Sequence, residues 1–157
     1  MAVQKILVAW ALCAGVAAGA RGQAREDTTG LDRALQRYAS LVMRMSSDSI
    51  GAMYLPTGVL AAPGRAPIVG PAAVAEFLKT FADYRVLAYA AHADSVMVKA
   101  DTAWQLSRWW QRVRIPAGDT VMVSGGLAAE WVRVSRGEWR LRRLGTFPMD
   151  AGPMPVH

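Results

Sequence analysis

Residues 102–147 read “TAWQLSRWWQRVRIPAGDTVMVSGGLAAEWVRVSRGEWRLRRLGTF”, and polar and apolar side chains alternate along much of this stretch. Alternation with a period of two is typical of half-buried β-strands. Turn-forming residues interrupt it at “IPAGD” (115–119) and “SRGE” (135–138). Together with a similar segment before it, the stretch predicts an antiparallel meander. Its four strands are expected at about 85–99, 102–114, 120–134 and 138–147.

Gly125 and Gly126 lie inside the third of these predicted strands. Glycine in a strand interior often marks a β-bulge, which bends the strand and increases its twist. We therefore predict a bulge at these two residues that curves the sheet.

The chain before Tyr84 has a helical pattern instead of the alternating one. Thr29 and Asp32 resemble a capping pair, so the first helix is predicted to begin there. Its apolar face is expected to carry Leu31, Leu35, Tyr38, Val42 and Met45.

A short second helix is predicted after the polar “SSDS” (46–49), and Tyr54 is expected near its end, before Pro56. “TGVLAA” (57–62) reads as a short strand, and “PGRAP” (63–67) reads as a loop.

Gly70 and Pro71 stand at the cap and the first position of a predicted third helix. Helices at the front of the chain and a bent antiparallel sheet behind them predict an α+β fold. We expect a cone shape, because the bent sheet and the helices can enclose a pocket between them.

Residues 1–24 have the layout of a secretory signal peptide, with Lys5 before an apolar run of about 15 residues. Small residues would allow cleavage after Ala20 or Ala24. A membrane anchor is the alternative, but a bilayer span needs about 20 apolar residues. We therefore expect an exported protein, periplasmic or extracellular, that has no membrane attachment after cleavage.

The folded domain is then expected to cover residues 25–149, followed by an irregular tail at 150–157. Cys13, the only cysteine, falls within the predicted signal, so the mature chain would have no disulfide and no cysteine-ligated metal.

The formal charge of +6 falls to +4 when Lys5 and Arg21 are removed with the signal. The remaining excess of positive charge comes from arginines late in the chain, which we expect mainly on a solvated sheet face. No nucleic-acid-binding motif occurs, and the second histidine is His157 in the tail. We predict no nucleic-acid partner, no metal site and no cofactor.

Two segments carry a resemblance to a known family. They are “LQRYASLVMRMSSDSIGAMYLPTGVLAAPGRAPIVGPAAVAEFL” (35–78) and “AAEWVRVSRGEWRLRRLGTFP” (128–148). With them the chain resembles the nuclear transport factor 2-like superfamily, close to its SnoaL-like and ketosteroid isomerase-like members. The likeness covers about residues 29–147, and its diffuse motifs specify the fold far better than the function.

The ketosteroid isomerases make this resemblance more specific. In that family a helix tyrosine and a protonated aspartate stabilise the enolate, and a second aspartate moves the proton. The protonated aspartate is a known example of pKa tuning. Tyr38 matches the tyrosine, whereas the proton-moving aspartate falls at Ala62 and the hydrogen-bonding one near Ala129. Alanine cannot accept a proton, so the resemblance does not imply isomerase chemistry by this route.

His92 is the candidate acid or base, because it is the only histidine outside the tail. Asp94 follows two residues later, and on a strand both side chains would face one side. The pair could act with Tyr38 as a hydrogen-bond donor. The plainer alternative is a surface histidine at a strand end.

One face of the predicted strand 102–114 alternates tryptophan with arginine, a composition enriched in protein interfaces. We predict a homodimer through this outer face, although it could instead stack planar or anionic ligands. The opposite face, which carries Gln105, Ser107 and Trp109, is expected to line the cone.

The sequence leaves three hypotheses open. The first is an exported domain that binds a small apolar or weakly anionic molecule, and the second is a SnoaL-like isomerase, cyclase or hydrolase that uses His92 or Asp94 with Tyr38. The third is a dimeric assembly module. An enzyme needs an acid or base at the pocket, and a binding protein needs a cavity of about 300 Å³ or more. The predicted ligand-contacting residues are Tyr38, Tyr54, His92, Trp109, Trp131 and Arg143.

Overall fold

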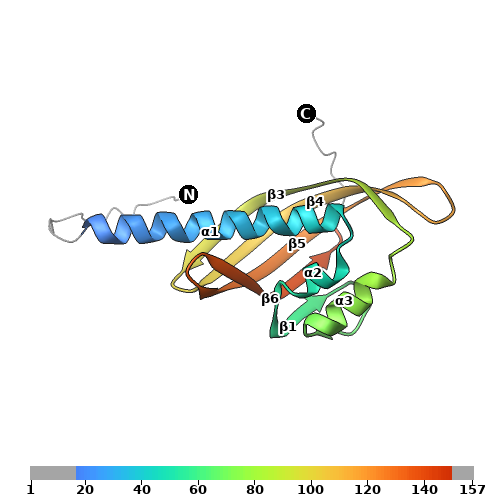
Figure 1. The fold of residues 1–157 in the computed structure, drawn as a ribbon. Helices are drawn as coiled ribbons and strands as arrows, with labels where there is room; N and C mark the ends of the chain where they lie inside the picture. The colour runs from blue at the N-terminus through green and yellow to red at the C-terminus, as the bar shows by residue number, and fades with distance from the viewer. Residues whose placement is uncertain (1–16, 150–157) are drawn as a thin grey trace, which may run out of the picture.

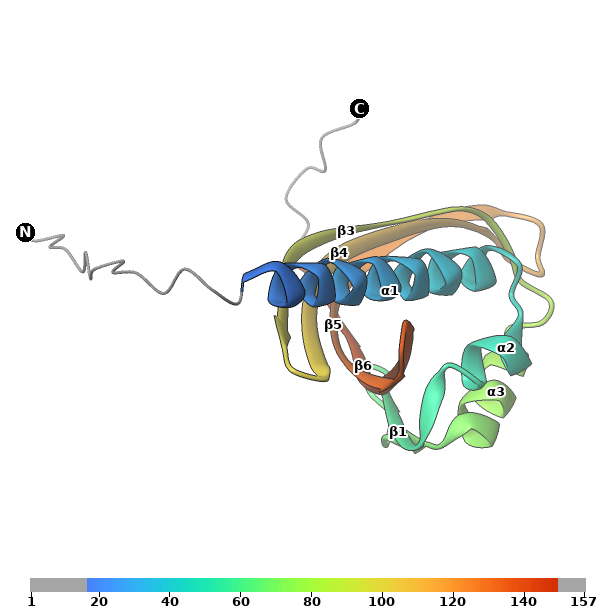
Figure 2. The same ribbon diagram turned by 60° about the vertical axis from the view of Figure 1, so that its left-hand side comes forward.

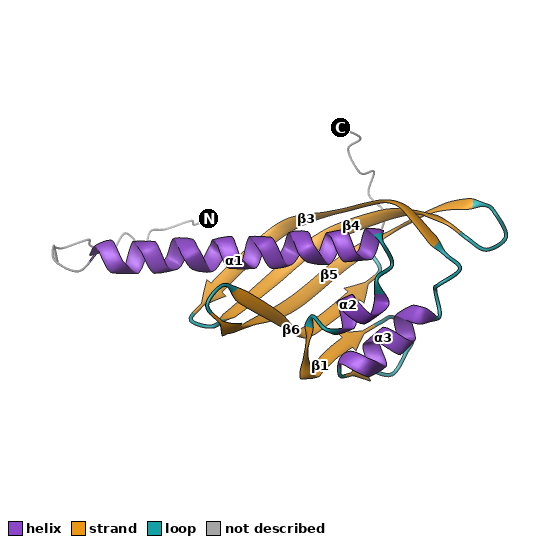
Figure 3. Cartoon of the chain, in the orientation of Figure 1, coloured by secondary structure: helices purple, strands orange, loops and turns teal. Residues whose placement is uncertain are grey.

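The computed structural model describes the backbone of residues 17–149 and the side chains of residues 28–149. Within residues 17–149, three helices and one six-stranded sheet form an α+β fold (Figures 1 and 3). The helices are α1 (Ala17–Met43), α2 (Ser47–Gly51) and α3 (Pro71–Lys79). The strands are β1 (Tyr54–Ala61), β2 (Ile68–Val69), β3 (Arg85–Lys99), β4 (Thr102–Arg114), β5 (Thr120–Ser135) and β6 (Glu138–Phe147).

The strands follow the order β2-β1-β6-β5-β4-β3 across the sheet. The β3–β6 meander is antiparallel and confirms the four strands predicted from the alternating pattern. β1 pairs with β6 in parallel, which makes the sheet mixed. The sequence pattern did not predict β2, because two residues are too short to show a period.

The sheet curves around the helices, and α1 lies across its concave side (Figure 2). α2 and α3 pack against each other near β1, at the other end of this concave side (Figure 2). The core between these layers is formed mainly by Leu31, Leu41, Ile50, Tyr54, Val74, Leu127, Trp131, Trp139, Leu141 and Leu144.

The predicted start of the first helix at Thr29 is wrong, since α1 already begins at Ala17. Residues 17–26 read “AAGARGQARE”, in which alanine, arginine, glutamine and glutamate favour the helix and outnumber the two glycines that disfavour it. Part of the predicted signal therefore lies in α1. Its other residues, 1–16 with Cys13, and the predicted tail, 150–157, lie outside the described residues.

Tyr54 is the second correction, because it opens β1 instead of ending the short helix. The Leu141 N–H of β6 donates to the Met53 carbonyl at 2.8 Å, and Tyr54 is the register partner of Leu141. Pairing with β6 therefore recruits Tyr54 into the sheet before Pro56 is reached.

The predicted bulge at Gly125 and Gly126 is also wrong. The β4–β5 register runs without a break from Thr102–Val132 to Arg114–Thr120. The irregularities in β5 lie further on, between Glu130 and Trp131 and between Arg133 and Ser135 in the pairing with β6.

The two glycines instead make room for Phe147. A Cβ at Gly126 would overlap the Phe147 ring, and one at Gly125 would lie 2.7 Å from the Phe147 carbonyl oxygen.

Among the described residues, no helix has the length and apolar character needed to cross a membrane.

Candidate functional site

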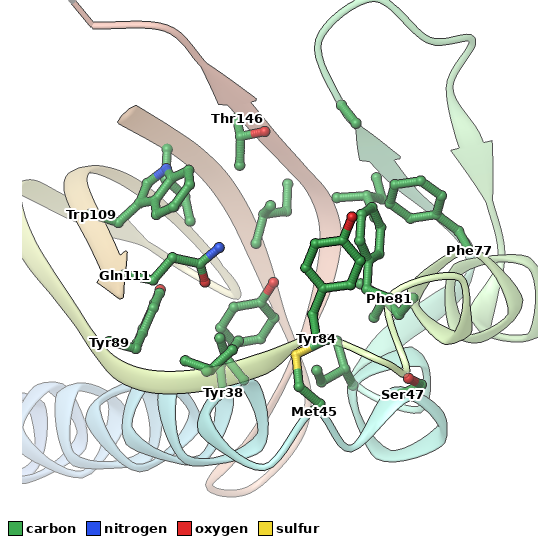
Figure 4. Close-up of a pocket in the computed structure, with 18 of the residues that line it drawn as sticks. Tyr38, Met45, Ser47, Phe77, Phe81, Tyr84, Tyr89, Trp109, Gln111 and Thr146 are labelled. Carbon is green, nitrogen blue, oxygen red and sulfur yellow. The ribbon is translucent and has the colours of Figure 1, made fainter. Parts of the chain in front are cut away.

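A cavity of about 290 Å³ lies between the concave face of the sheet, α1 and the α2–α3 pair. Figure 4 shows its side chains converging from these elements. The aromatic members of the lining are Tyr38, Tyr54, Phe77, Phe81, Tyr84, Tyr89 and Trp109. The others are Val42, Met45, Ser47, Ile50, Leu60, Ala62, Leu78, Val86, Gln111, Val113, Leu127, Leu144 and Thr146.

The cavity wall carries no carboxylate, imidazole, ammonium or guanidinium group among the described residues. Tyr89, Trp109 and Gln111 lie together on one side, and Phe77, Phe81 and Ser47 lie on the other (Figure 4). A ligand that fits this arrangement is apolar over most of its surface and polar at one end.

Tyr54 places a hydrogen-bonding group at the wall of this cavity. The residue is only 1% exposed, and its hydroxyl makes no hydrogen bond of good geometry, although the Tyr38 hydroxyl lies close enough to interact with it. Burial raises the pKa of Tyr54 well above its ordinary value, and the nearby Tyr38 hydroxyl adds to the rise. The hydroxyl therefore stays protonated and is available to donate to a ligand.

Tyr38 comes from α1 and is partly exposed along its length, while its hydroxyl end is buried. Burial raises the pKa of Tyr38 to about 12, with a smaller opposing effect from Tyr54. Its ring meets Trp131 edge to face, with 6.4 Å between centroids and an interplanar angle of 88°. This packing fixes the direction in which the Tyr38 hydroxyl points.

Trp131 is a core residue that supports the site and is not part of the cavity wall. It is 1% exposed, and its indole N–H donates to Gln105 Oε1 at 3.0 Å. Gln105 Nε2 in turn donates to the buried Ser107 Oγ at 2.7 Å. Of the residues predicted on the inner face of β4, Trp109 lines the cavity, whereas Gln105 and the buried Ser107 do not.

Trp109 lines the cavity with its ring. Its indole N–H donates to the Gly126 carbonyl at 3.1 Å, so the ring offers a ligand an aromatic surface and no free donor. No described group hydrogen-bonds to the neighbouring Gln111 side chain, which leaves its amide free to recognise a polar end of a ligand.

The structure places His92 and Asp94 outside the cavity, and both side chains are exposed. Asp94 accepts hydrogen bonds from Arg108, the shortest from Nη2 at 2.7 Å. This contact, with a smaller effect from His92, lowers the pKa of Asp94 and makes its carboxylate a weaker base. Because His92 is the register partner of Arg108, it belongs to the outer face of the sheet.

Arg143 is also exposed and does not line the cavity, because its position on β6 faces away from it. Of the residues predicted to contact a ligand, the cavity therefore brings together Tyr38, Tyr54 and Trp109. Ala62 joins them in the wall, whereas Ala129 is buried in the core.

Sequence reasoning missed Tyr84, Tyr89 and Thr146 as cavity residues. Gln111 carried a usable signal, because it alternates with Trp109 on the same strand face. Val86 and Tyr89 both line the cavity although they are three positions apart. A register irregularity between Val86 and Ala88 reverses which side chains of β3 face the cavity, and no sequence pattern predicts it.

A family model for the SnoaL-like domain matches residues 23–145, which is most of the chain. The chain belongs to the SnoaL-like domain family. No curated protein matches this SnoaL-like domain in sequence.

Solved structures place the domain among nuclear transport factor 2-like folds. It is similar to a ketosteroid isomerase-like protein from Erwinia carotovora atroseptica, with a TM-score of 0.65, 24% identity, and coverage of 73% of this chain and 90% of that one. A nuclear transport factor 2-like protein with a cystatin-like fold from Novosphingobium aromaticivorans gives a TM-score of 0.64 and 22% identity, covering 85% and 89% of the two chains.

A third similar structure, from Catenulispora acidiphila, was solved in complex with S-DNPA. It is 14% identical with a TM-score of 0.61, and the match covers 79% of this chain and 95% of that one. At such identities these likenesses establish the fold of the SnoaL-like domain and leave its chemistry to be argued from its own residues.

Proposed function

We propose that this SnoaL-like domain binds one small, largely apolar molecule in the cavity beside Tyr54 and has no catalytic activity of its own. The observation that carries the proposal is the uncharged, aromatic cavity with a buried hydroxyl at its wall that makes no hydrogen bond of good geometry. Burying a polar group without a partner costs stability, and a ligand acceptor would offset that cost.

The size and the polar groups of the cavity define the ligand class. Its volume of about 290 Å³ lies at the lower edge of the range for small-molecule pockets, so the ligand is modest in size. The Tyr54 hydroxyl and the Gln111 amide favour a ligand with a carbonyl, a hydroxyl or a weakly acidic group at one end. A raised tyrosine pKa keeps such donors neutral, which also suits a weakly anionic ligand.

An isomerase, cyclase or hydrolase is the alternative that the family allows. It has less support, because His92 and Asp94 lie outside the cavity and Ala62 stands where the resembling isomerases carry their proton-moving carboxylate. The tyrosines that remain are donors with no base beside them in the described wall.

We also propose that the domain is exported and forms a homodimer through the outer face of the sheet. Support for export comes from the signal-like residues 1–24. Support for the dimer comes from an exposed apolar group on adjacent strands, consisting of Met97, Trp104 and Leu106. A module that only assembles would need no cavity, so the cavity favours binding over assembly alone.

Native mass spectrometry of the protein isolated from its exported compartment tests these proposals together. We expect a retained small molecule, and the mass of the chain will show whether cleavage follows Ala20 or Ala24. The substitution Ala62→Phe should abolish retention by filling the cavity, because Ala62 lines it and is only partly exposed. The matched control is Ala82→Phe at an exposed position outside the wall.

Retention that is equal in the two phenylalanine variants would place the molecule elsewhere and overturn the proposal. A turnover of the retained molecule by the purified protein would overturn the non-catalytic part of it and favour the enzyme.

A further inference from the structure

A second cavity, of about 300 Å³, lies between α1 and the turn that joins β5 to β6. Figure 1 shows this turn beneath α1. The second cavity shares no lining residue with the first. It is lined by Gly30, Arg33, Ala34, Arg37, Ala52, Met53, Gly137, Glu138, Trp139 and Arg140.

This second cavity is strongly basic. Three guanidinium groups face one carboxylate, an excess of two positive charges. Arg33 and Arg37 stand one helical turn apart on α1, an arrangement of like charges that slightly destabilises a helix, and Arg33 Nε also donates to the Thr29 carbonyl at 3.3 Å. Glu138 is already engaged, since its carboxylate accepts from Arg140 Nε at 2.9 Å and from Ser135 Oγ at 3.2 Å.

Trp139 lines the same cavity and carries a buried N–H. The residue is 3% exposed, and its indole N–H has no acceptor among the described groups. A Cβ at Gly30 would lie 3.2 Å from this nitrogen and 3.1 Å from the Gly137 Cα. Glycine at position 30 therefore lets α1 pack closely against the turn between β5 and β6 and against the indole edge.

We propose that this second cavity binds a small oxyanion, a phosphate or carboxylate group, with Arg37 and Arg33 as donors beside the Trp139 indole. Guanidinium and indole groups donate hydrogen bonds and accept none, so the occupant must supply acceptor oxygens. Guanidinium forks match carboxylate and phosphate geometry in particular. The Arg133 guanidinium carbon lies 5.8 Å from the Trp139 ring centroid, and this contact helps to hold the indole in place.

The test is a titration of the ¹⁵N-labelled protein followed through the indole N–H resonance of Trp139, which is assigned by its proximity to Gly30. Inorganic phosphate and acetate are the two probes, and sodium chloride at equal ionic strength is the reference. We expect a saturable shift of this resonance with phosphate or acetate and none with chloride. Whichever probe binds more tightly identifies the source of the oxyanion group.

Arg37→Gln removes one donor at an exposed position, so it should leave the fold intact and weaken the binding by about tenfold. Arg112→Gln is the matched control on β4, outside both cavities, and should bind as the parent does. The proposal is overturned if the Trp139 resonance does not move, which would mean that water alone occupies the cavity. It is equally overturned if Arg37→Gln and Arg112→Gln weaken binding to the same extent.

Discussion

The Tyr54 hydroxyl makes a residue-scale prediction in which stability and affinity change in opposite directions. Because the free protein buries this group without a hydrogen bond of good geometry, Tyr54→Phe should leave the free energy of unfolding unchanged or raise it, by about 1 kcal/mol. The same change should weaken ligand binding by about threefold to tenfold, through the loss of one hydrogen bond. Chemical denaturation of the ligand-free protein and a binding titration measure the two effects.

Tyr84→Phe is the control for this experiment, because Tyr84 lines the same cavity and its hydroxyl is not among the buried, unpartnered atoms. Removing the Tyr84 hydroxyl should leave the free energy of unfolding unchanged. A large loss of stability in ligand-free Tyr54→Phe would mean that the hydroxyl has a partner within the folded protein.

Tyr38 makes the second residue-scale prediction, which concerns alkaline pH. Burial raises its pKa from 10.0 in the unfolded chain to about 12 in the folded protein. The folded state then holds the proton more tightly, so this contribution to stability is fully present below pH 10.0 and is lost as pH rises toward about 12. The loss amounts to at most about 2–3 kcal/mol over this window.

Thermal unfolding between pH 9 and about 12 measures this loss, and tyrosinate absorbance reports the titration itself. In Tyr38→Phe, the melting temperature should fall less steeply with pH over this window. An unchanged slope would contradict the buried position of the hydroxyl. Tyr54 and Tyr89 should titrate in the same direction, because burial raises the pKa of both.

At the scale of elements, the contact of β5 with the end of β6 depends on Gly125 and Gly126. A Cβ at Gly125 would lie 2.7 Å from a backbone oxygen, whereas a Cβ at Gly126 would meet the Phe147 ring, which can rotate away. Both alanine substitutions should destabilise the protein, by about 1–3 kcal/mol, with the larger effect at Gly125. Urea denaturation of the two variants gives the ranking.

A companion variant separates the two causes. Adding Phe147→Ala should recover much of the stability lost in Gly126→Ala, because the clashing ring is gone, but little of that lost in Gly125→Ala. Equal recovery in both would show that the glycines are needed for another reason.

At the scale of the whole molecule, the outer face of the sheet determines the predicted assembly. Met97 is the register partner of Trp104, and Leu106 lies two residues along β4, so an apolar group crosses two strands. Leu106→Asp should convert the dimer to a monomer, because it buries a charge in the interface. Sedimentation velocity measures the change.

Val69→Asp is the matched control, since Val69 is an apolar residue of similar exposure, 56% against 46%, on β2 at the far edge of the sheet. That variant should remain dimeric. A parent protein that sediments as a monomer at all concentrations would contradict the proposed dimer, and it would leave the cavity and its ligand unaffected.

The sequence by itself determined the four long strands and the α+β class. Alternation, turn residues and helix caps act between near neighbours in the chain, so a strand such as β4 can be recognised without knowing its partners. The same local rule assigned Trp109 to the inner face and Trp104 to the outer one. The SnoaL-like family resemblance likewise came from patterns spread along the chain.

Only the tertiary structure decided which side chains meet at each cavity, because these depend on register and on contacts between distant segments. Tyr54 enters the sheet through pairing with β6, and Tyr89 turns toward the cavity after an irregularity in β3. Arg37 and Trp139 stand about a hundred positions apart and line one cavity. No local pattern encodes such encounters, since the packing of α1 on the curved sheet creates them.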